Sequence, residues 1–401
     1  MRRIYLIALV AGLTVLASLQ APAPATGSET HWWRGNTHTH SLWSDGDGAP
    51  EWITDWYVKA DYDFLMLSDH NILSQGERWF AITENGRLTP ARVEVLVELF
   101  GSDAVEVRET DKGREMRLKT LADLRKQFES PGEFLLIQGE EVTDSFEGKP
   151  VHINGVNLDE LIEPQGGTSV RDTMNRNVDA IAAQGERLGQ PTLAHINHPN
   201  FGWGLTWQDV AAVTGDNFFE VYNGHTGVRN QGDPEHVSTE ELWDRALTLR
   251  LTELELGLLY GVATDDAHNY WKWGAKAHNP GRGWVVVRSE KLEADAIVAA
   301  MQRGDFYASS GVELDDIQFD GKSYTIDIRG AEGVTYTTRF IGTRNADEPG
   351  ALLASTDENP AVYELRGDEL YVRAVVTSSQ DHSNPYAAGD KQTAWVQPVR
   401  P

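Results

Sequence analysis

Short apolar runs in this chain end repeatedly at a histidine or a carboxylate. Residues 64–67 read Phe-Leu-Met-Leu and are followed at once by Ser68, Asp69 and His70. Comparable runs lead into His38 and His40, Glu141, His195 and His198, Glu220, and Asp266 and His268. Buried parallel strands read as continuous apolar runs, and in barrels of alternating strands and helices the reactive residues lie where the strands end. The pattern predicts one polar rim that suits a metalloenzyme.

From Trp32 onward, strand-like runs alternate with amphipathic stretches, which is the pattern of repeated βα units and predicts the α/β class. Helices are predicted over residues 49–59, 89–100, 120–129, 169–188, 206–213, 238–249 and 292–303. The highly charged residues 102–119 interrupt this alternation. We expect a surface loop or hairpin there.

The pattern changes after Ser310 and Gly311. Short alternating runs follow at residues 324–329, 334–341, 361–365, 369–376 and 393–397, with Gly, Asp and Asn between them. Strands at such spacing with no helices between them indicate an antiparallel β-sandwich. We therefore expect a catalytic domain over residues 26–311 and a C-terminal β-sandwich over 312–401 that supplies no catalytic group.

Composition narrows the classes of function. The 401 residues carry a formal net charge of −26, with 35 Lys and Arg against 61 Asp and Glu. Nucleic-acid binding rests on clustered Lys and Arg, so we expect no nucleic-acid partner. The acidity either attracts divalent cations or only keeps the protein soluble. The absence of cysteine excludes disulfides, thiol nucleophiles and thiolate-bound zinc.

The N-terminus has the pattern of a signal peptide. Met1, Arg2 and Arg3 form a charged start, residues 4–19 are mostly apolar, and 23–25 read Ala-Pro-Ala. The sequence predicts cleavage after residue 25, export to the periplasm or the exterior, and no stable membrane insertion afterwards. An uncleaved anchor is the alternative, but the run is short against the ~20 residues of a spanning helix.

His38 and His40 stand two apart on a predicted strand, so their side chains project from one face. Neutral imidazole nitrogens suit Zn, Mn or Fe. Asp45, in the loop just after that strand, adds an oxygen ligand. A lone His-x-His is weak, but here Ser44-Asp45-Gly46 and then Ser68-Asp69-His70 follow it.

This combination resembles the polymerase and histidinol phosphatase (PHP) superfamily of metallohydrolases. The family motifs appear in order as His38-Thr-His40, Ser44-Asp45-Gly46, Ser68-Asp69-His70, Gly139-Glu-Glu141, His152, His198-Pro199 and Asp266-Ala-His268. The match covers residues from about 33 to 268. The opening Trp33-Arg-Gly-Asn-Thr-His-Thr-His40 and the appended strands are most similar to a secreted branch related to carbaryl hydrolase.

The resemblance implies a distorted seven-stranded, TIM-like (β/α) barrel that holds two or three divalent metal ions, Zn, Mn or Fe. The metal ligands that it implies are His38, His40, Asp45, His70, Glu141, His152, His198, Asp266 and His268. Glu140 and Glu141 both follow Gly139, and the family spacing favours Glu141. His195 and His198 share a strand end, and Pro199 favours His198. Asp69 is expected to orient a ligating histidine.

Other residues are weaker candidates. Glu220 and Asn223 either line the pocket or form a hydrogen-bonded rim. Arg282 follows the last motif and either clamps an anionic substrate bidentately or is a turn residue that pairs with a surface acid. Trp203, Trp207, Tyr270, Trp271 and Trp273 either wall the cleft or pack elsewhere. His31, His236, His278 and His382 have no partner at ligand spacing and are taken as ordinary.

The sequence thus predicts a secreted, metal-dependent phosphoesterase acting on a small-molecule substrate. A metal-bridging hydroxide beside Glu141 would attack a phosphomonoester or diester. Asp45 or His268 would stabilise or protonate the leaving oxygen, and Arg282 would bind the anion. The alternative is a hydrolase of carbamate, ester or amide bonds, as in the branch resembled. A metal- or glycan-binding protein without catalysis is a third possibility.

Overall fold

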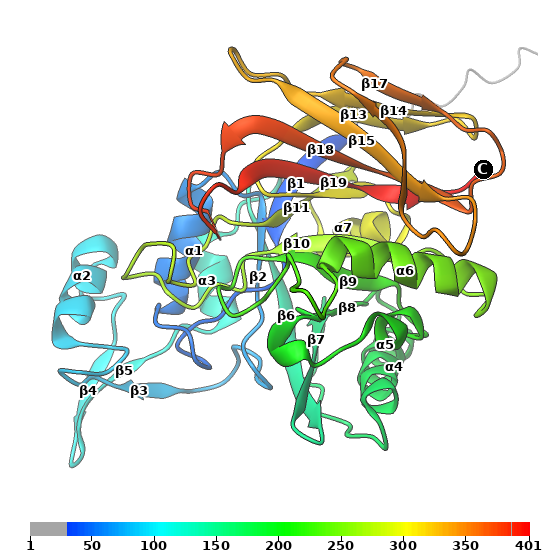
Figure 1. The fold of residues 1–401 in the computed structure, drawn as a ribbon. Helices are drawn as coiled ribbons and strands as arrows, with labels where there is room; N and C mark the ends of the chain where they lie inside the picture. Colours follow the sequence, from blue (N-terminus) through cyan, green and yellow to red (C-terminus); the bar gives the residue numbers. More distant parts are fainter. Residues whose placement is uncertain (1–29, 386) are drawn as a thin grey trace, which may run out of the picture.

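The computed structural model describes residues 30–385 and 387–401. The predicted signal peptide, residues 1–25, lies outside the described residues. Among the described residues, no helix is long and apolar enough to cross a membrane. The fold is mixed α/β, with a large sheet and helices on its flanks (Figure 1).

Seven α-helices and one short 3-10 helix lie in the described part of the chain. They are α1 (Pro50–Lys59), α2 (Pro90–Phe100), α3 (Leu121–Phe128), α4 (Val170–Leu188), α5 (Trp207–Ala211), α6 (Thr239–Thr252), α7 (Ala294–Gln302) and η1 (Phe201–Trp203). Each predicted helix is present. The ends have local causes: Thr120 and Asp123 form a reciprocal capping box that starts α3, and Gly189 in the left-handed region ends α4.

The central sheet has thirteen strands in the order β10-β9-β8-β7-β6-β2-β1-β11-β12-β19-β18-β15-β16. Its first members along the chain are β1 (His31–Asn36), β2 (Phe64–Leu67), β6 (Leu135–Phe146), β7 (Lys149–Val156), β8 (Leu193–Ile196), β9 (Phe218–Asn223), β10 (Tyr260–Thr264), β11 (Trp284–Ser289) and β12 (Phe306–Ser309). The C-terminal members are β15 (Tyr336–Thr343), β16 (Ala351–Thr356), β18 (Tyr371–Asp381) and β19 (Lys391–Val399).

The strand directions differ from the expected repeat of parallel βα units. β1, β2 and β6 are parallel, as are β8, β9 and β10, but β7 is antiparallel to both β6 and β8. The reason is local, because β6 turns at Glu147 and Gly148, both with positive φ, straight into β7 with no crossover helix. Antiparallel strands need only such a tight turn.

A closed barrel is not confirmed. Strands β10 and β16 are the two ends of the sheet, so no backbone ladder closes a ring. A side chain bridges part of the gap between β10 and β19. Gly261 N donates to Gln397 Oε1 (2.9 Å), and Gln397 Nε2 donates to Gly261 O (2.8 Å).

The C-terminal strands continue the central sheet through backbone hydrogen bonds. β12 pairs antiparallel with β19, so the ladder crosses the expected boundary at residue 311. A second sheet of β13 (Leu314–Phe319), β14 (Ser323–Ile328) and β17 (Ala361–Glu364) packs on this region. Buried side chains of β14, Tyr324 among them, share one apolar cluster with Phe340 and Val396 of the large sheet. Figure 1 shows this part in yellow to red, lying against the rest of the fold.

Residues 74–119 form an inserted unit between β2 and α3, drawn in cyan at the left of Figure 1. It contains helix α2 and a small sheet of β3 (Trp79–Ala81), β4 (Val107–Thr110) and β5 (Gly113–Arg117). β4 and β5 are the antiparallel hairpin within the charged segment. An apolar cluster that includes Leu96 and Met116 packs the unit against Leu42 and Trp43.

Candidate metal centre

All nine residues that the family resemblance implied as ligands lie together in the structure. They fall into four overlapping groups in which one nitrogen or oxygen per residue lies within 4.8 Å of the others. The groups are His40, Asp45, His70 and His268; His38, His40 and Glu141; His38, His198 and Asp266; and His70, Glu141 and His152. Histidine nitrogens and carboxylate oxygens at this spacing are a donor set for divalent transition metals.

Backbone pairing beyond the named strands brings the two histidines after β1 to the residues after β10. Thr39 and Ala267 form an isolated parallel bridge. His40 N donates to Ala267 O, and Asp266 N donates to His38 O, each at 3.0 Å. As a result, Asp266 Oδ1 lies 3.3 Å from His38 Nε2 and 3.2 Å from His40 Nε2.

Glu141 lies at the centre of the cluster. Its carboxylate is 2.7 Å from His70 Nδ1, 3.0 Å from His152 Nδ1 and 3.2 Å from His198 Nε2. Asn197 Nδ2 also donates to Glu141 Oε1 at 2.8 Å. Because successive residues of a strand point to opposite faces, the neighbouring Glu140 points away, and its Oε1 accepts from Ile162 N.

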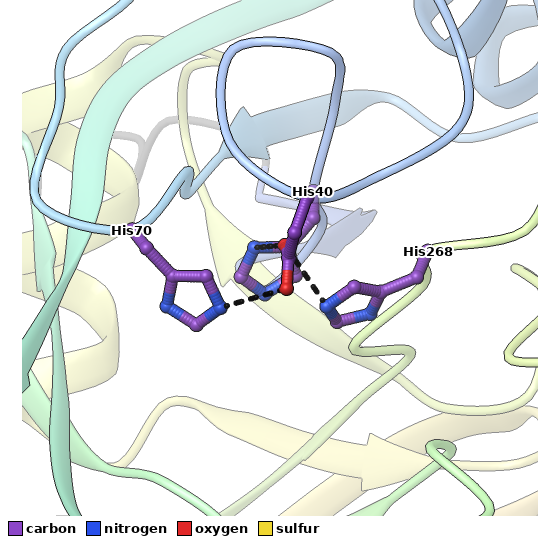
Figure 2. Close-up of side chains that lie close together, drawn as sticks. His40, His70 and His268 are labelled. Atoms are coloured by element: carbon purple, nitrogen blue, oxygen red, sulfur yellow. Dashed lines mark ion pairs between the residues drawn. The ribbon is translucent and has the colours of Figure 1, made fainter. Parts of the chain in front are cut away.

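Asp45 stands on the open side of the cluster. Figure 2 shows the imidazoles of His40, His70 and His268 directed at one carboxylate. Asp45 supplies that carboxylate, with distances of 3.6 Å to His40 Nδ1, 3.5 Å to His70 Nε2 and 3.3 Å to His268 Nε2. The Asp45 side chain is 54% exposed, whereas His40 is fully buried. Solvent therefore reaches the cluster from the Asp45 side.

Among the described residues, three buried atoms of the cluster make no hydrogen bond of regular geometry, although charged groups lie close to each of them. They are His38 Nε2, His40 Nε2 and Glu141 Oε2, which belong to one of the four groups. A cation between them would satisfy all three, so the residues present fit a bound metal.

The charges within the cluster depend on each other. Burial alone raises the pKa of Glu141, but His70, His152 and His38 hold it well below its usual range. Burial lowers the pKa of His70, yet Glu141 and Asp45 raise it to about 11. Burial and the neighbouring His268 lower the pKa of His40 to about 3. Positive imidazolium thus balances the ionised carboxylates, which is the role that a bound cation would take over.

A second layer of polar groups orients His38. Its Nδ1 lies 2.6 Å from Glu220 Oε1, which also accepts from Thr264 Oγ1 at 2.7 Å. The other oxygen of Glu220 accepts from His198 N at 2.7 Å and Asn223 Nδ2 at 2.8 Å. Fixing Nδ1 in this way leaves Nε2 of His38 for the cluster. Glu220 and Asn223 are therefore supporting residues behind the cluster.

The sequence led us to expect that Asp69 orients a ligating histidine, but its hydrogen bonds go to two serines instead. It accepts from Ser41 N (2.8 Å) and Ser41 Oγ (2.7 Å), and from Ser44 N (3.0 Å) and Ser44 Oγ (2.6 Å). Asp69 thus shapes the turn that carries Asp45. Gly46 completes this turn, because a Cβ there would collide with the carbonyl oxygen of His40.

Arg282 is not brought to the cluster. Its fully buried guanidinium donates to the carbonyl oxygens of Gly224 (2.8 Å), Gly274 (3.3 Å) and Asn384 (3.3 Å). A guanidinium held by backbone oxygens in the interior is a structural tie, and this geometry disagrees with an anion clamp. The carboxylate of Asp265 has a related role, accepting from the backbone N–H groups of Arg282 (2.6 Å) and Gly283 (3.0 Å).

His195 belongs to none of the four groups, whereas His198 does. The Nε2 atom of His195 lies 3.2 Å from Thr37 Oγ1, and its ring centroid is 6.3 Å from that of His38. His195 therefore packs behind the cluster. The choice of His198, which precedes Pro199, stays a prediction.

Two further histidines lie beside the cluster that no sequence motif marks. The rings of His225 and His278 stack at 3.6 Å, and His225 lies 5.3 Å edge-on from His268. Neither follows a motif or has ligand spacing, so no pattern marks them. Asn197, which donates a hydrogen bond to Glu141, is a third residue beside the cluster that no motif marks.

The aromatic residues considered for the cleft take several roles. Tyr270 is buried in the core. Trp271 stacks on Trp52 at 4.5 Å, and Trp203 stacks on His236 at 4.0 Å. Trp203 and Trp207 line a separate cavity of about 290 Å³. Packing between aromatic rings thus accounts for the contacts of most of this set.

No family model matches this sequence, and a comparison with curated proteins finds no match either. Among solved structures, a two-domain protein of Bacteroides vulgatus, described as containing a predicted PHP-like metal-dependent phosphoesterase, is 13% identical. The alignment covers 92% of this chain and 96% of that chain, with a TM-score of 0.42.

An amidohydrolase of Chromobacterium violaceum, solved with bound sulfate and no metal, is 15% identical. Here 59% of this chain and 88% of that chain are covered, with a TM-score of 0.32. PsfC of Pseudomonas syringae is 13% identical over 68% of this chain and 88% of its own, with a TM-score of 0.33. The functional conclusion below rests on the cluster itself.

Proposed function

We propose that the protein is a metal-dependent hydrolase of phosphomonoesters or phosphodiesters, with two to three divalent ions (Zn, Mn or Fe) held by the nine-residue cluster. One observation carries the proposal: His38, His40 and Glu141 form one buried group of potential ligands, and His38 Nε2, His40 Nε2 and Glu141 Oε2 make no hydrogen bond of regular geometry. Together with the motif order, this donor set supports membership of the PHP superfamily, and the opening residues 33–40 with the appended strands support the branch related to carbaryl hydrolase. The N-terminal pattern supports export, so the enzyme would act in the periplasm or outside the cell.

The four groups suggest how the ions would be shared. Glu141 belongs to two groups and would be shared between two positions, and His38, His40 and His70 also each belong to two groups. Divalent ions held in this way lower the pKa of a coordinated water toward neutrality and offset charge that develops on the oxygens of the reacting group. Nine donors exceed the four to six that one transition metal takes.

The residues on the open side would handle the departing group. Asp45 is half exposed, and its Oδ1 lies 3.3 Å from His268 Nε2. Asp45 and Asp266 raise the pKa of His268 against the lowering effect of burial. Because both residues would also hold an ion, we assign this pair the stabilisation of charge on the leaving oxygen through that ion. Among the described residues, no side chain after His268 joins the four groups, so the C-terminal strands would support the centre without contributing to it.

The second candidate is hydrolysis of a carbamate, ester or amide. One observation favours it: the buried Arg282 is tied to backbone oxygens, which removes the guanidinium expected to bind a phosphate. Ions held by the cluster would supply the same chemistry, an activated water, for a carbonyl carbon as for phosphorus.

The test begins with elemental analysis of the purified protein and continues with three substrates, an aryl phosphate, a bis-aryl phosphate and an aryl carbamate. We expect two to three ions per chain and turnover of a phosphate ester. Less than one ion per chain would remove the metal centre. Turnover of the carbamate alone would replace the first candidate by the second.

A further inference from the structure

Asp45 is the most exposed of the nine cluster residues. Its side chain is 54% exposed, against 26% for His70 and 15% for His268 in the same group. Asp45 is also the only carboxylate in that group. Packing of the side chain itself does not fix such a residue, so its position depends on the backbone of the Asp45 loop, residues 44–47.

The inserted unit holds this loop from outside. Arg87, in the segment between β3 and α2, donates from Nη1 to the carbonyl oxygens of Ser44 (2.7 Å) and Gly46 (2.9 Å). These two carbonyls flank Asp45 on either side in the sequence. One guanidinium thus joins two carbonyl groups on either side of Asp45.

Arg92, on α2, reinforces the same contact. Its Nη1 donates to Asp47 O at 3.4 Å and to the carbonyl oxygen of Arg87. Its guanidinium also lies 5.1 Å from the ring centroid of Trp271, whose Nε1 donates to Asp47 O at 3.0 Å. The inserted unit therefore contacts three carbonyl oxygens of one loop, those of Ser44, Gly46 and Asp47.

The inner side of the loop is tied to the cluster. Ser44 bonds Asp69, and Asp47 N donates to the carbonyl oxygen of His268 at 2.8 Å. The loop thus lies between the inserted unit and the cluster, so a movement of either would be transmitted to Asp45.

We propose that Arg87 is a positioning residue through which the inserted unit sets the occupancy of the metal position formed by His40, Asp45, His70 and His268. The inference rests on the metal centre proposed above and not on the substrate. The other three groups each contain Glu141 or Asp266, which are buried on strands or at strand ends. Loss of Arg87 would therefore weaken one position and spare the others.

The experiment compares full-length wild type with R87A, R87K and R108A. Arg108 is the matched control, because its contacts with Trp79 and Glu115 stay within the inserted unit. Zn²⁺ is titrated against a competing chelator, and the ions retained are counted by elemental analysis. We expect the weakest-bound equivalent to lose affinity about 10- to 100-fold in R87A, an intermediate loss in R87K and no change in R108A.

A double-mutant cycle tests whether Arg87 acts through Asp45. In a D45A background, R87A should remove no further affinity, because coupled residues are non-additive. Additive losses would overturn the proposal, as would wild-type Zn²⁺ affinity in R87A. Loss of the cooperative thermal transition in R87A would also overturn it, because Arg87 would then hold the fold and not the position.

The result is separable from the fate of the proposed function. Wild type that binds Zn²⁺ but hydrolyses no phosphate ester would defeat the phosphoesterase proposal and leave this cycle interpretable. Wild type that binds no Zn²⁺ would defeat both, and the wild-type titration alone would show it.

Discussion

Glu140 and Glu141 are neighbours on β6, and their carboxylates lie on opposite faces of the strand. Glu141 meets His70 at 2.7 Å inside the cluster. Glu140 accepts from Ile162 N at 2.5 Å on the other face, and its second oxygen is buried without a partner. The two residues share backbone, burial and chemistry, and they differ only in what they face. They therefore form a natural pair of test and control.

E141Q should abolish hydrolysis and reduce the number of bound ions, whereas E140Q should retain both. The amide of Gln keeps the shape but removes the charge that holds the imidazoles and the ions. A fall in kcat/KM of less than about tenfold in E141Q would amount to only about 1.4 kcal/mol of barrier and would contradict the central role of Glu141. Elemental analysis and steady-state kinetics on both variants provide the measurement.

E140Q should make folding stability less dependent on pH. Burial raises the pKa of Glu140 from 4.5 to about 8. Between these values the unfolded chain releases the proton that the folded chain keeps, so the free energy of unfolding falls as pH rises, by at most about 1.4 kcal/mol per pH unit. This stabilising contribution is complete below about pH 4.5 and is lost as the pH rises through about 8.

Urea unfolding of wild type and E140Q at several pH values between 5 and 9 measures the difference. The stability of wild type should fall relative to E140Q as pH rises. Parallel curves for the two proteins would show that Glu140 is ionised in the folded state already at low pH.

E220Q should weaken metal binding without removing any proposed ligand. Glu220 orients His38, because its Oε1 lies 2.6 Å from His38 Nδ1. Carboxylates that orient a ligand in this way contribute about 10- to 100-fold in metal affinity or activity. Chelator competition measures the affinity, and circular dichroism checks that the fold is kept. Unchanged affinity would mean that the imidazole is oriented by packing alone.

Metal binding should release protons at neutral pH. His70 carries a proton there, because Glu141 and Asp45 raise its pKa to about 11 against the effect of burial. A ligating imidazole nitrogen must lose that proton, so affinity should increase with pH. Calorimetric titration of Zn²⁺ in buffers of different ionisation enthalpy counts the protons. Heats that do not depend on the buffer would contradict this expectation.

R373A should destabilise the fold and leave metal content unchanged. Arg373 of β18 binds Asp244 of α6 through two nitrogens, at 2.7 and 2.6 Å, and both side chains are nearly buried. Removing one partner of a buried pair costs about 3–5 kcal/mol. R339A, at an exposed position of neighbouring β15, is the control and should change little. Equal unfolding midpoints for the two variants would show that this pair does not join the C-terminal strands to α6.

The sequence predicted those features whose causes are local. Helix α3 starts at the capping box of Thr120 and Asp123, three residues apart. Most of the cluster motifs follow a short apolar run, although Glu141 and His152 lie within β6 and β7. The antiparallel β6–β7 hairpin was missed, because the run after Glu141 becomes polar although the strand continues to Phe146. Pairing of β12 with β19 was missed because nothing in either segment specifies so distant a partner.

The hydrogen-bond partners of individual side chains were equally hard to predict. Arg282 and Asp69 carry charges that would suit a catalytic site. Both instead form hydrogen bonds with neighbouring backbone or hydroxyl groups. His225 and His278 reach the cluster only through the way that their loops fold together. Charge and residue type limit what a side chain can do, but its partner is set by tertiary packing.

The main pairing of β1 also constrains the order in which the centre is built. β1, which leads into His38 and His40, forms its longest ladder with β11, from His31 opposite Ser289 to Gly35 opposite Val285. During synthesis these two histidines emerge early, yet the strand that fixes them emerges some 250 residues later. Contacts so distant in sequence form late and slowly. A growing chain would thus present scattered histidines and carboxylates to passing ions, and selective loading of the centre would have to wait for the nearly finished polypeptide.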